Sequence, residues 1–118
     1  MRHRVKGKTL GRQADHRDHM MRNLTASLII YEKITTTQAK AKAVAPMIEK
    51  LISGAQRRER RMALIHLKKF FFDQSAAQKV MDVLLDRYKQ KQSGFTRINK
   101  LARTRVGDGA SMVSLELT

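Results

Sequence analysis

Apolar side chains recur along this chain at spacings that separate helices from strands. The first regular stripe consists of Met20, Met21, Leu24, Leu28 and Ile29. Intervals of three and four place these side chains on one face of a helix. Asp15 is a suitable N-cap, with Asp18 three residues on, and both acids lie near the positive end of the helix dipole. We therefore expect a first helix from Asp15 to about Tyr31.

A short β-like run and a second helical stripe follow. The segment from Glu32 to Thr36 holds Ile34 among threonines, which predicts a strand closed by a threonine cap. The apolar positions after it are Ala39, Ala43, Val44, Met47, Ile48, Leu51, Ile52 and Ala55. They predict a helix that begins near Thr37. Pro46 removes a backbone hydrogen bond inside this pattern, so a kink or break is expected there, and Gly54 is expected to mark the end.

Two more helices are predicted before the chain turns β-like. The third, from about Arg57 to Phe71, has a stripe made of Ala63, Leu64, Leu67, Phe70 and Phe71. Four arginines crowd its start, which is unfavourable against the helix dipole, so either the start frays or an anion relieves it. Asp73 or Ser75 then caps a fourth helix. Its inward face is formed by Ala77, Val80, Met81, Leu84 and Tyr88.

The C-terminal quarter has the pattern of a β-hairpin. Apolar residues alternate with polar ones at Val113, Ser114, Leu115, Glu116 and Leu117. The segment Gly107-Asp108-Gly109 is a turn signal between this run and an earlier one that starts near Phe95. We expect two strands joined by that turn.

Charge narrows the class of partner. The 118 residues carry a formal net charge of +15, which favours nucleic acid or an anionic membrane surface, with nucleic acid preferred. From Met1 to Arg22 there are seven Lys and Arg against Asp15 and Asp18. Few of the side chains up to Gln13 can be buried, so residues 1–14 are expected to form a flexible basic arm and residues 15–118 a single domain. The seven Lys and Arg between Asp86 and Asp108, where no acid occurs, predict a second basic surface on the hairpin.

The composition also limits other chemistry. There is no cysteine, so disulfides, zinc thiolates and thiol nucleophiles are excluded, and a reducing cytoplasmic setting is natural. No apolar run approaches the ~20 residues of a membrane span, and no signal-peptide core follows the charged start. We expect a protein that is neither exported by a recognisable signal nor inserted in a membrane.

Several short motifs in a fixed order carry a resemblance. They are Met1-Arg2-His3, His16-Arg17, Arg22-Asn23, Ala39-Lys40-Ala41-Lys42, Pro46, Glu49-Lys50-Leu51-Ile52, Gly94-Phe95-Thr96-Arg97-Ile98, Lys100-Leu101, Gly107-Asp108 and Leu115-Glu116-Leu117. In this set the chain resembles the bacterial large-subunit ribosomal protein seventeen family from end to end. The resemblance implies a two-layer α+β fold in the order helix, strand, three helices, two strands.

The resemblance also implies a function. Family membership would make the chain a structural constituent of the large ribosomal subunit that binds and bridges large-subunit ribosomal RNA near the exit of the peptide tunnel, beside neighbouring ribosomal proteins. Lys and Arg act on RNA duplexes mainly through phosphates, ribose and shape, and aromatic residues are too scarce here to favour stacking platforms. The expected RNA-binding residues are Arg2, His3, Arg4, Lys6, Lys8, Arg12, His16, Arg17, Arg22, Asn23, Arg97, Lys100, Arg103 and Arg105.

Other functional classes fit less well. A metal-dependent nuclease needs clustered carboxylates, and the ten acids here are scattered singly. A DNA-compacting or regulatory protein would need a recognition helix or dimer seam, and neither stands out. His16 and His19 beside two aspartates imitate a metal site, but two imidazoles with neighbouring carboxylates are a weak ligand set. We therefore expect no enzyme activity, no cofactor, no metal and no small-molecule substrate.

Of the three adjacent rings Phe70–Phe72, two are expected in the core, while Phe72 is available to a neighbouring protein.

Overall fold

The computed structural model describes residue 3 and residues 7–118. The expectations for Arg2, Arg4 and Lys6 therefore lie outside the described residues. The elements are α1 (Ala14–Tyr31), β1 (Lys33–Thr37), α2 (Gln38–Arg57), α3 (Arg60–Phe70), α4 (Gln74–Lys79), the π-helical stretch η1 (Val80–Leu84), α5 (Leu85–Arg87), β2 (Thr96–Thr104) and β3 (Ser111–Leu117). Because α4, η1 and α5 follow one another without a break, the order is helix, strand, three helical rods, two strands. The expected α+β fold is confirmed.

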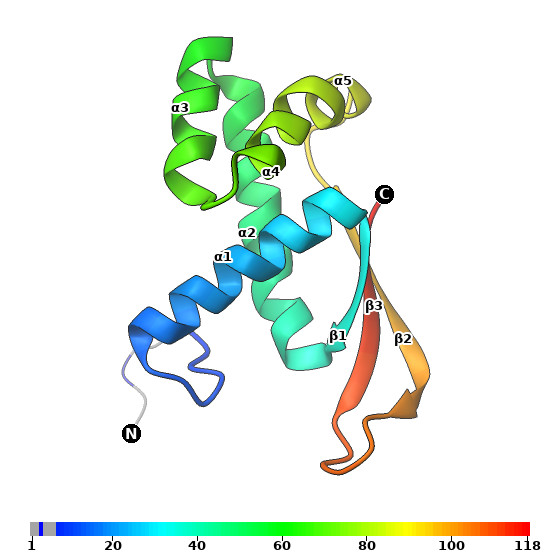
Figure 1. Ribbon diagram of the computed structural model, residues 1–118. Coiled ribbons are helices and arrows are strands. Elements are labelled where there is room, and N and C mark those ends of the chain that lie inside the picture. Colours follow the sequence, from blue (N-terminus) through cyan, green and yellow to red (C-terminus); the bar gives the residue numbers. More distant parts are fainter. Residues whose placement is uncertain (1–2, 4–6) are drawn as a thin grey trace.

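The three strands form one antiparallel sheet in the order β1-β3-β2. Figure 1 shows the helices on one side of this sheet, with α1 crossing α2 and with α3, α4 and α5 at the end of the molecule opposite the β2–β3 turn. Register places Ile34, Leu115 and Ile98 in one row across the sheet. Since side chains alternate between faces, this apolar row packs on the helices and the rows on either side of it point the other way.

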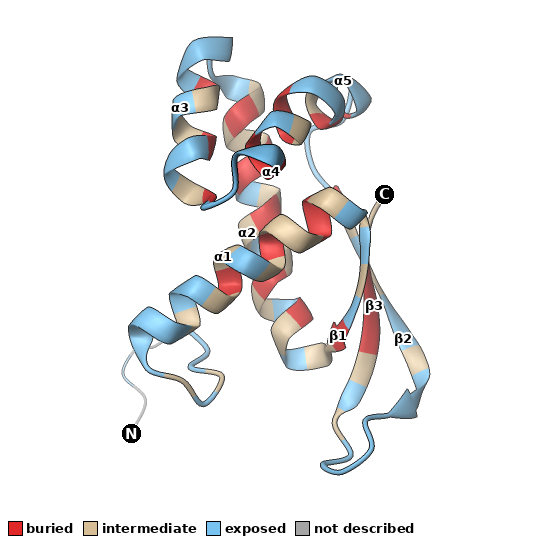
Figure 2. Cartoon of the chain, in the orientation of Figure 1, coloured by how far each residue is buried: buried red, intermediate tan, exposed pale blue. Residues whose placement is uncertain are grey.

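The core lies between the helices and the inner face of the sheet (Figure 2). The expected inward face of the fourth helix is confirmed, since all five of its side chains are buried. In the last strand Val113 and Leu115 are buried as expected, but Ser114 between them is only 4% exposed, so burial does not alternate there as the sequence pattern predicted. Phe71 is buried and Phe72 is 61% exposed, so the expected division of the three adjacent rings is also correct.

The caps of α2 and α4 agree with the expectations, whereas the start of α1 differs. The N-cap of α1 is Gln13, with no side-chain bond, so Asp15 lies inside the first turn instead of capping it. Thr37 caps α2, accepting from the backbone N–H of Lys40 at 3.5 Å, and Asp73 caps α4, accepting from the N–H of Ser75 at 3.0 Å, as expected. Pro46 does not break α2, and its ring lies on the exposed side.

Gly54 has a different role from the helix end expected for it. Helix α2 continues to Arg57, and the Arg58 Nη1 donates a hydrogen bond to the Gly54 carbonyl at 2.8 Å. A Cβ at Gly54 would lie 2.7 Å from that Nη1. Glycine at this position leaves room for the guanidinium to approach the helix backbone, and it does not end the helix. Two of the four crowded arginines belong to the end of α2 and the link after it, where the helix dipole favours cations.

One carboxylate fastens the middle of α2 to the start of β2. Glu49 Oε1 accepts from the backbone N–H of Phe95 at 2.9 Å, from the N–H of Thr96 at 3.1 Å and from the Thr96 hydroxyl at 3.0 Å. Its Oε2 accepts from the N–H of Gly94 at 3.2 Å. These bonds satisfy backbone donors that precede the sheet ladder. They fix where the hairpin leaves the helical layer.

A second carboxylate joins the end of α1 to the last helical rod. Glu32 has a left-handed backbone (φ 63°) at the C-cap of α1, and its side chain meets the Arg87 Nη2 at 2.8 Å and the Lys79 Nζ at 3.0 Å. Hydrogen bonds from Arg87 and then Lys79 lower the pKa of Glu32 to about 2. The turn between α1 and β1 is thereby tied to α4 and α5.

Candidate nucleic-acid interface

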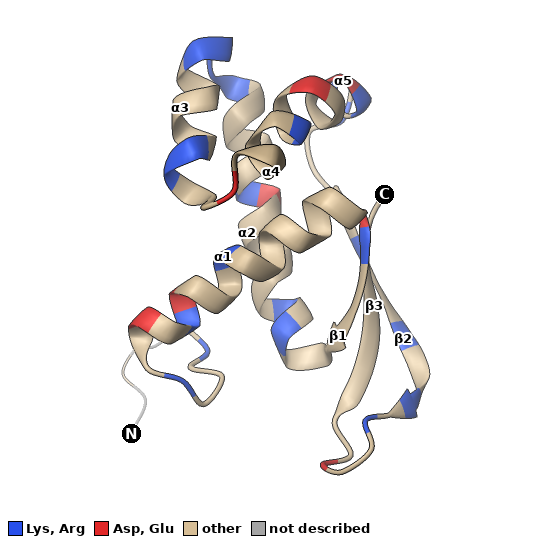
Figure 3. Cartoon of the chain, viewed as in Figure 1, with Lys and Arg blue, Asp and Glu red and all other residues tan. Residues whose placement is uncertain are grey.

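Lys and Arg residues cover three separate parts of the surface (Figure 3). One part is the described N-terminal segment with the start of α1, another is the β2–β3 hairpin, and the third is the end of the molecule where α2 passes into α3. Two of these are the basic surfaces expected from the sequence. The third comes from arginines that were considered only as a crowded helix start.

The hairpin presents exposed cations around its rim. Arg97, Lys100 and Arg103 are exposed, and none of them forms an ion pair within the described chain. Register places Arg97 opposite Glu116 and Lys100 opposite Val113. Since the positions of Arg97 and Lys100 differ by an odd number, they lie on opposite faces of the sheet. The hairpin therefore offers positive charge to both sides.

The far end of the hairpin is shaped by an irregular register. Between the pairs Lys100↔Val113 and Thr104↔Ser111, three residues of β2 face one residue of β3. Such a bulge bends the strand and increases its twist. Arg103 lies in this bulge, so its side chain is placed by the bend and not by the regular ladder.

Arg105 differs from the other hairpin cations because it has an acidic partner. Its guanidinium forms hydrogen bonds and an ion pair with Asp108 inside the turn. The side-chain bond from Arg105, followed by the backbone N–H of Ala110, lowers the pKa of Asp108 to about 2. This pair offsets much of the charge that Arg105 would offer to RNA. It helps to hold the turn in place.

The described N-terminal segment is partly attached to the domain. His3 and Lys8 are exposed, while Leu10 packs against the core. The Arg12 Nη1 donates to the Leu10 carbonyl at 2.6 Å, within a turn in which Leu10 and Gly11 have positive φ angles of 53° and 66°. The Arg17 Nη1 reaches the Arg12 carbonyl at 3.4 Å. The C-terminal part of this segment is thus held against the start of α1.

The start of α1 faces the start of α2 across two shallow hollows. One hollow, of about 650 Å³, is lined by Lys8, Arg17 and Lys42 among other residues. The other, of about 430 Å³, includes His16, Asn23 and Lys40 in its lining. In the first hollow Arg17 shares the lining with Lys42 and with the acids Asp15 and Asp18, and in the second His16 and Asn23 share it with Lys40. Neither lysine is among the RNA-binding residues expected from the sequence.

Arg22 has extensive internal contacts. Its Nε meets Asp18 Oδ2 at 3.0 Å, and its Nη1 donates to the carbonyls of Lys69 at 3.1 Å and Phe70 at 3.0 Å. The guanidinium carbon also lies 5.0 Å from the centroid of the Phe70 ring. This cation satisfies the last carbonyls of α3, so its described role is to hold α3 on α1. Contact with RNA stays a prediction for it.

The described part of the chain holds neither a cluster of metal-ligating side chains nor a helix that could span a membrane. Residue 3 and residues 7–118 contain no group of three or more His, Asp or Glu side chains placed to hold a metal ion. Asp15, His16, Asp18 and His19 therefore do not form such a cluster. Among the helices of those same residues, none is long and apolar enough to cross a membrane.

Comparison with known proteins identifies the family. The family model described as ribosomal protein L17 matches residues 20–118. A large ribosomal subunit protein bL17 from Sphingopyxis alaskensis is 44% identical over 119 residues, covering 98% of this chain and 82% of that protein. The bL17 protein of Hyphomonas neptunium is 42% identical over 99% of this chain and 82% of its own length. The bL17 protein of Thermomicrobium roseum is 40% identical over 98% of this chain and 97% of its own length.

The family match covers more than half of the chain, and the relatives extend it through the basic N-terminal segment. The protein is a structural, non-enzymatic ribosome component, in agreement with the basic surfaces described above. The chain belongs to the ribosomal protein L17 family.

Proposed function

We propose that this protein binds and bridges segments of large-subunit ribosomal RNA through phosphate contacts, and so stabilises the cytoplasmic large subunit that carries out translation. The observation that carries the proposal is the placement of unpaired cations on the rim of the hairpin, with a second basic region at the start of α1. Cations on separate parts of one rigid domain suit the bridging of two backbones. The RNA-binding residues proposed are those expected from the sequence, with Arg105 and Arg22 contributing less because of their internal partners.

The mechanism follows from the charges. Each phosphate that Lys or Arg neutralises releases counterions, so RNA affinity falls steeply as the salt concentration rises. Most contacts of this kind position the protein and carry little sequence information, so specificity comes from the shape of the folded RNA. The basic arm, residues 1–14, would lie between RNA helices while the hairpin contacts RNA from another side.

The position in the subunit is a further part of the proposal. The resemblance to the family suggests a site near the exit of the peptide tunnel, with other large-subunit proteins as neighbours. Phe72, 61% exposed beside α1, is the apolar side chain that we assign to such a protein neighbour.

Salt-dependent binding to a large-subunit RNA fragment tests the phosphate mechanism. We expect simultaneous Arg97→Ala, Lys100→Ala and Arg103→Ala to lower the slope of log affinity against log salt by about 2 to 3, at 0.7 to 0.9 per lost contact. The matched control carries Arg97→Lys, Lys100→Arg and Arg103→Lys, which keeps all three charges and should keep the slope. An unchanged slope in the alanine variant, with far-UV circular dichroism equal to wild type, would show that the hairpin does not contact phosphate.

A further inference from the structure

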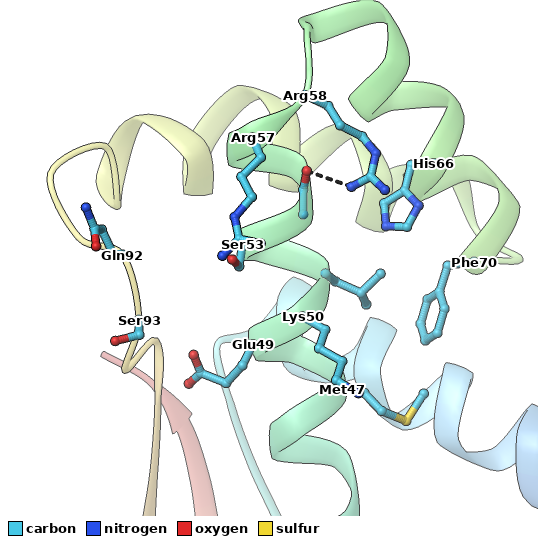
Figure 4. Close-up of a pocket in the computed structure, with 12 residues that line it drawn as sticks. Met47, Glu49, Lys50, Ser53, Arg57, Arg58, His66, Phe70, Gln92 and Ser93 are labelled. Carbon is cyan, nitrogen blue, oxygen red and sulfur yellow. Dashed lines mark hydrogen bonds between the residues drawn. The ribbon is translucent and has the colours of Figure 1, made fainter.

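A broad hollow lies on a face of α2 that belongs to neither expected RNA-binding surface. Its volume is about 970 Å³, and it is bounded by α3 on one side and the segment before β2 on the other (Figure 4). We call it the α2–α3 groove, defined by Lys50, Ser53, Arg57, Arg58, His66 and Ser93. None of these residues is among those expected to bind RNA from the sequence.

The floor of the groove is one polar stripe of a helix. Lys50, Ser53 and Arg57 follow one another at spacings of three and four along α2, so they share a face. Figure 4 shows the side chains of Ser53 and Arg57 close together on this face. The opposite face of the same helix carries Ile48, Leu51, Ile52 and Ala55 into the core. The groove is therefore floored by a rigid element that the core holds in place.

Gly54 and Arg58 form one wall of the groove. Because Gly54 has no side chain, the Arg58 guanidinium folds back onto α2 and donates to the Gly54 carbonyl at 2.8 Å. This contact places the guanidinium beside His66 of α3 (Figure 4). Desolvation and then the nearby charges of Arg58 and Lys69 lower the pKa of His66. The wall thus has a positive potential even where its imidazole is neutral.

The balance of charge in the groove is strongly positive. Lys50, Arg57 and Arg58 line it, and within the part of the chain that the structure describes none of them pairs with an acid. The one acid in the lining is Glu49, whose two oxygens already accept four hydrogen bonds from the start of β2. An anionic ligand would therefore meet three cations and a carboxylate that is already satisfied.

The basic surface continues around the end of α2. A smaller hollow of about 360 Å³ shares Arg58 and Gln92 with the groove and adds the cations Arg60, Lys89 and Lys91 and the acid Asp86. The two hollows are therefore neighbours, and cations outnumber acids in both linings. A basic surface of this kind fits an extended polyanion better than a single small anion.

We propose that the α2–α3 groove binds a length of RNA sugar–phosphate backbone, as a third contact separate from the arm and the hairpin. This inference rests on the proposed ribosomal RNA-binding function. The cations would contact phosphates, and the hydroxyls of Ser53 and Ser93 and the amide of Gln92 supply neutral donors and acceptors suited to phosphate oxygens and the ribose 2′-hydroxyl. The groove lies beside the C-terminal half of α2 and the segment before β2, away from the β2–β3 turn, in a molecule whose longest extent is 44 Å (Figure 1). One domain would therefore hold RNA segments that are far apart.

A charge-matched pair of double variants tests the groove. Lys50→Ala with Arg57→Ala removes two exposed groove cations, and Arg61→Ala with Lys68→Ala removes two exposed cations of α3 that do not line the groove. Both variants have the same net charge, and neither change touches a buried side chain. We expect the groove variant to bind a large-subunit RNA fragment on the order of tenfold more weakly, with a salt slope lower by about 1.5, and the control to change by less than about twofold. If both variants lose the same amount of RNA affinity, the groove is not an RNA-binding site. The proposed function would still stand in that case, provided that the wild-type protein binds the RNA fragment.

A second measurement locates the RNA directly. Because the chain has no cysteine, Ser53→Cys introduces a single attachment point for an iron chelate that cleaves nearby RNA backbone. We expect localised cleavage of the RNA in assembled large subunits, and none at the same nucleotides from Ser75→Cys on the exposed start of α4. Absence of cleavage from position 53 would overturn the proposal.

Discussion

Glu49 offers the sharpest test of how the hairpin is held on the helices. Its carboxylate is the acceptor for the backbone N–H groups of Gly94, Phe95 and Thr96 and for the Thr96 hydroxyl. Glu49→Ala removes all four bonds. Glu49→Gln keeps one oxygen that can accept the three bonds made by Oε1, but loses the charge and the bond to Gly94.

The expected cost follows from burial. Gly94 is exposed, so water replaces its lost partner, whereas the bonds to Phe95 and Thr96 are partly buried. A buried donor left without a partner costs about 1 to 3 kcal/mol, and partial exposure reduces this. We expect Glu49→Ala to lower the free energy of unfolding by about 2 to 4 kcal/mol and Glu49→Gln by about 1 kcal/mol. At about 4 °C per kcal/mol, the alanine variant should melt on the order of 8 to 16 °C below wild type.

Thermal unfolding followed by circular dichroism measures the difference. Glu59→Gln is the matched control, because Glu59 is exposed and its side chain makes no capping bond at the start of α3. The control should stay within about 0.5 kcal/mol of wild type. If Glu49→Ala has the same melting temperature as the control, the Glu49 carboxylate does not anchor β2. The hairpin and the segment that bounds the groove would then be held in place by other contacts.

Three other outcomes are expected. Deleting residues 1–13 should weaken RNA binding strongly at moderate salt and lower the melting temperature by only a few degrees, since Leu10 alone of the described deleted residues packs on the core; a large loss of stability would refute this. Glu32→Gln should be less stable than wild type at neutral pH by about 1 kcal/mol, a modest loss because the ion pairs of Glu32 are about one third exposed. Since folding lowers the pKa of Glu32 from 4.5 to about 2, the stabilisation by its carboxylate is present above pH 4.5 and is lost as the pH falls through 2. Urea titrations of the two proteins should therefore give equal stabilities at that low pH. Calorimetric titration with zinc or manganese should show no stoichiometric binding; binding that His16→Ala with His19→Ala abolishes would contradict the metal-free interpretation.

Periodicity was sufficient for the elements and their buried faces, because those depend on local spacing. The inward positions of the fourth helix follow directly from it, whereas the turn at Gly107–Gly109 follows from its glycine-rich sequence. Periodicity failed where a boundary depends on a contact. Gly54 had the signal of a helix end, yet it lies inside α2, where an arginine four residues later donates to its carbonyl.

The candidate interface was less accessible to sequence reasoning. A count of charges identified the basic hairpin, but it treated Arg97 and Arg105 alike, although Arg105 is paired with an acid three residues away. Likewise, Arg22 was counted as a free cation, and its bonds to the end of α3 span more than forty positions. Lys42 was missed because its neighbours across the hollow come from a different element. Which cation meets which acceptor is decided by tertiary structure.

Co-sedimentation with ribosomal subunits tests the central claim most directly. The tagged chain, expressed in bacterial cells, would be followed through a high-salt sucrose cushion beside separated large and small subunits. A structural constituent that bridges RNA at several points is expected to stay with the large subunit in stoichiometric amount and to be absent from the small subunit. Recovery at the top of the cushion, or equal distribution between the two subunits, would contradict the proposed function.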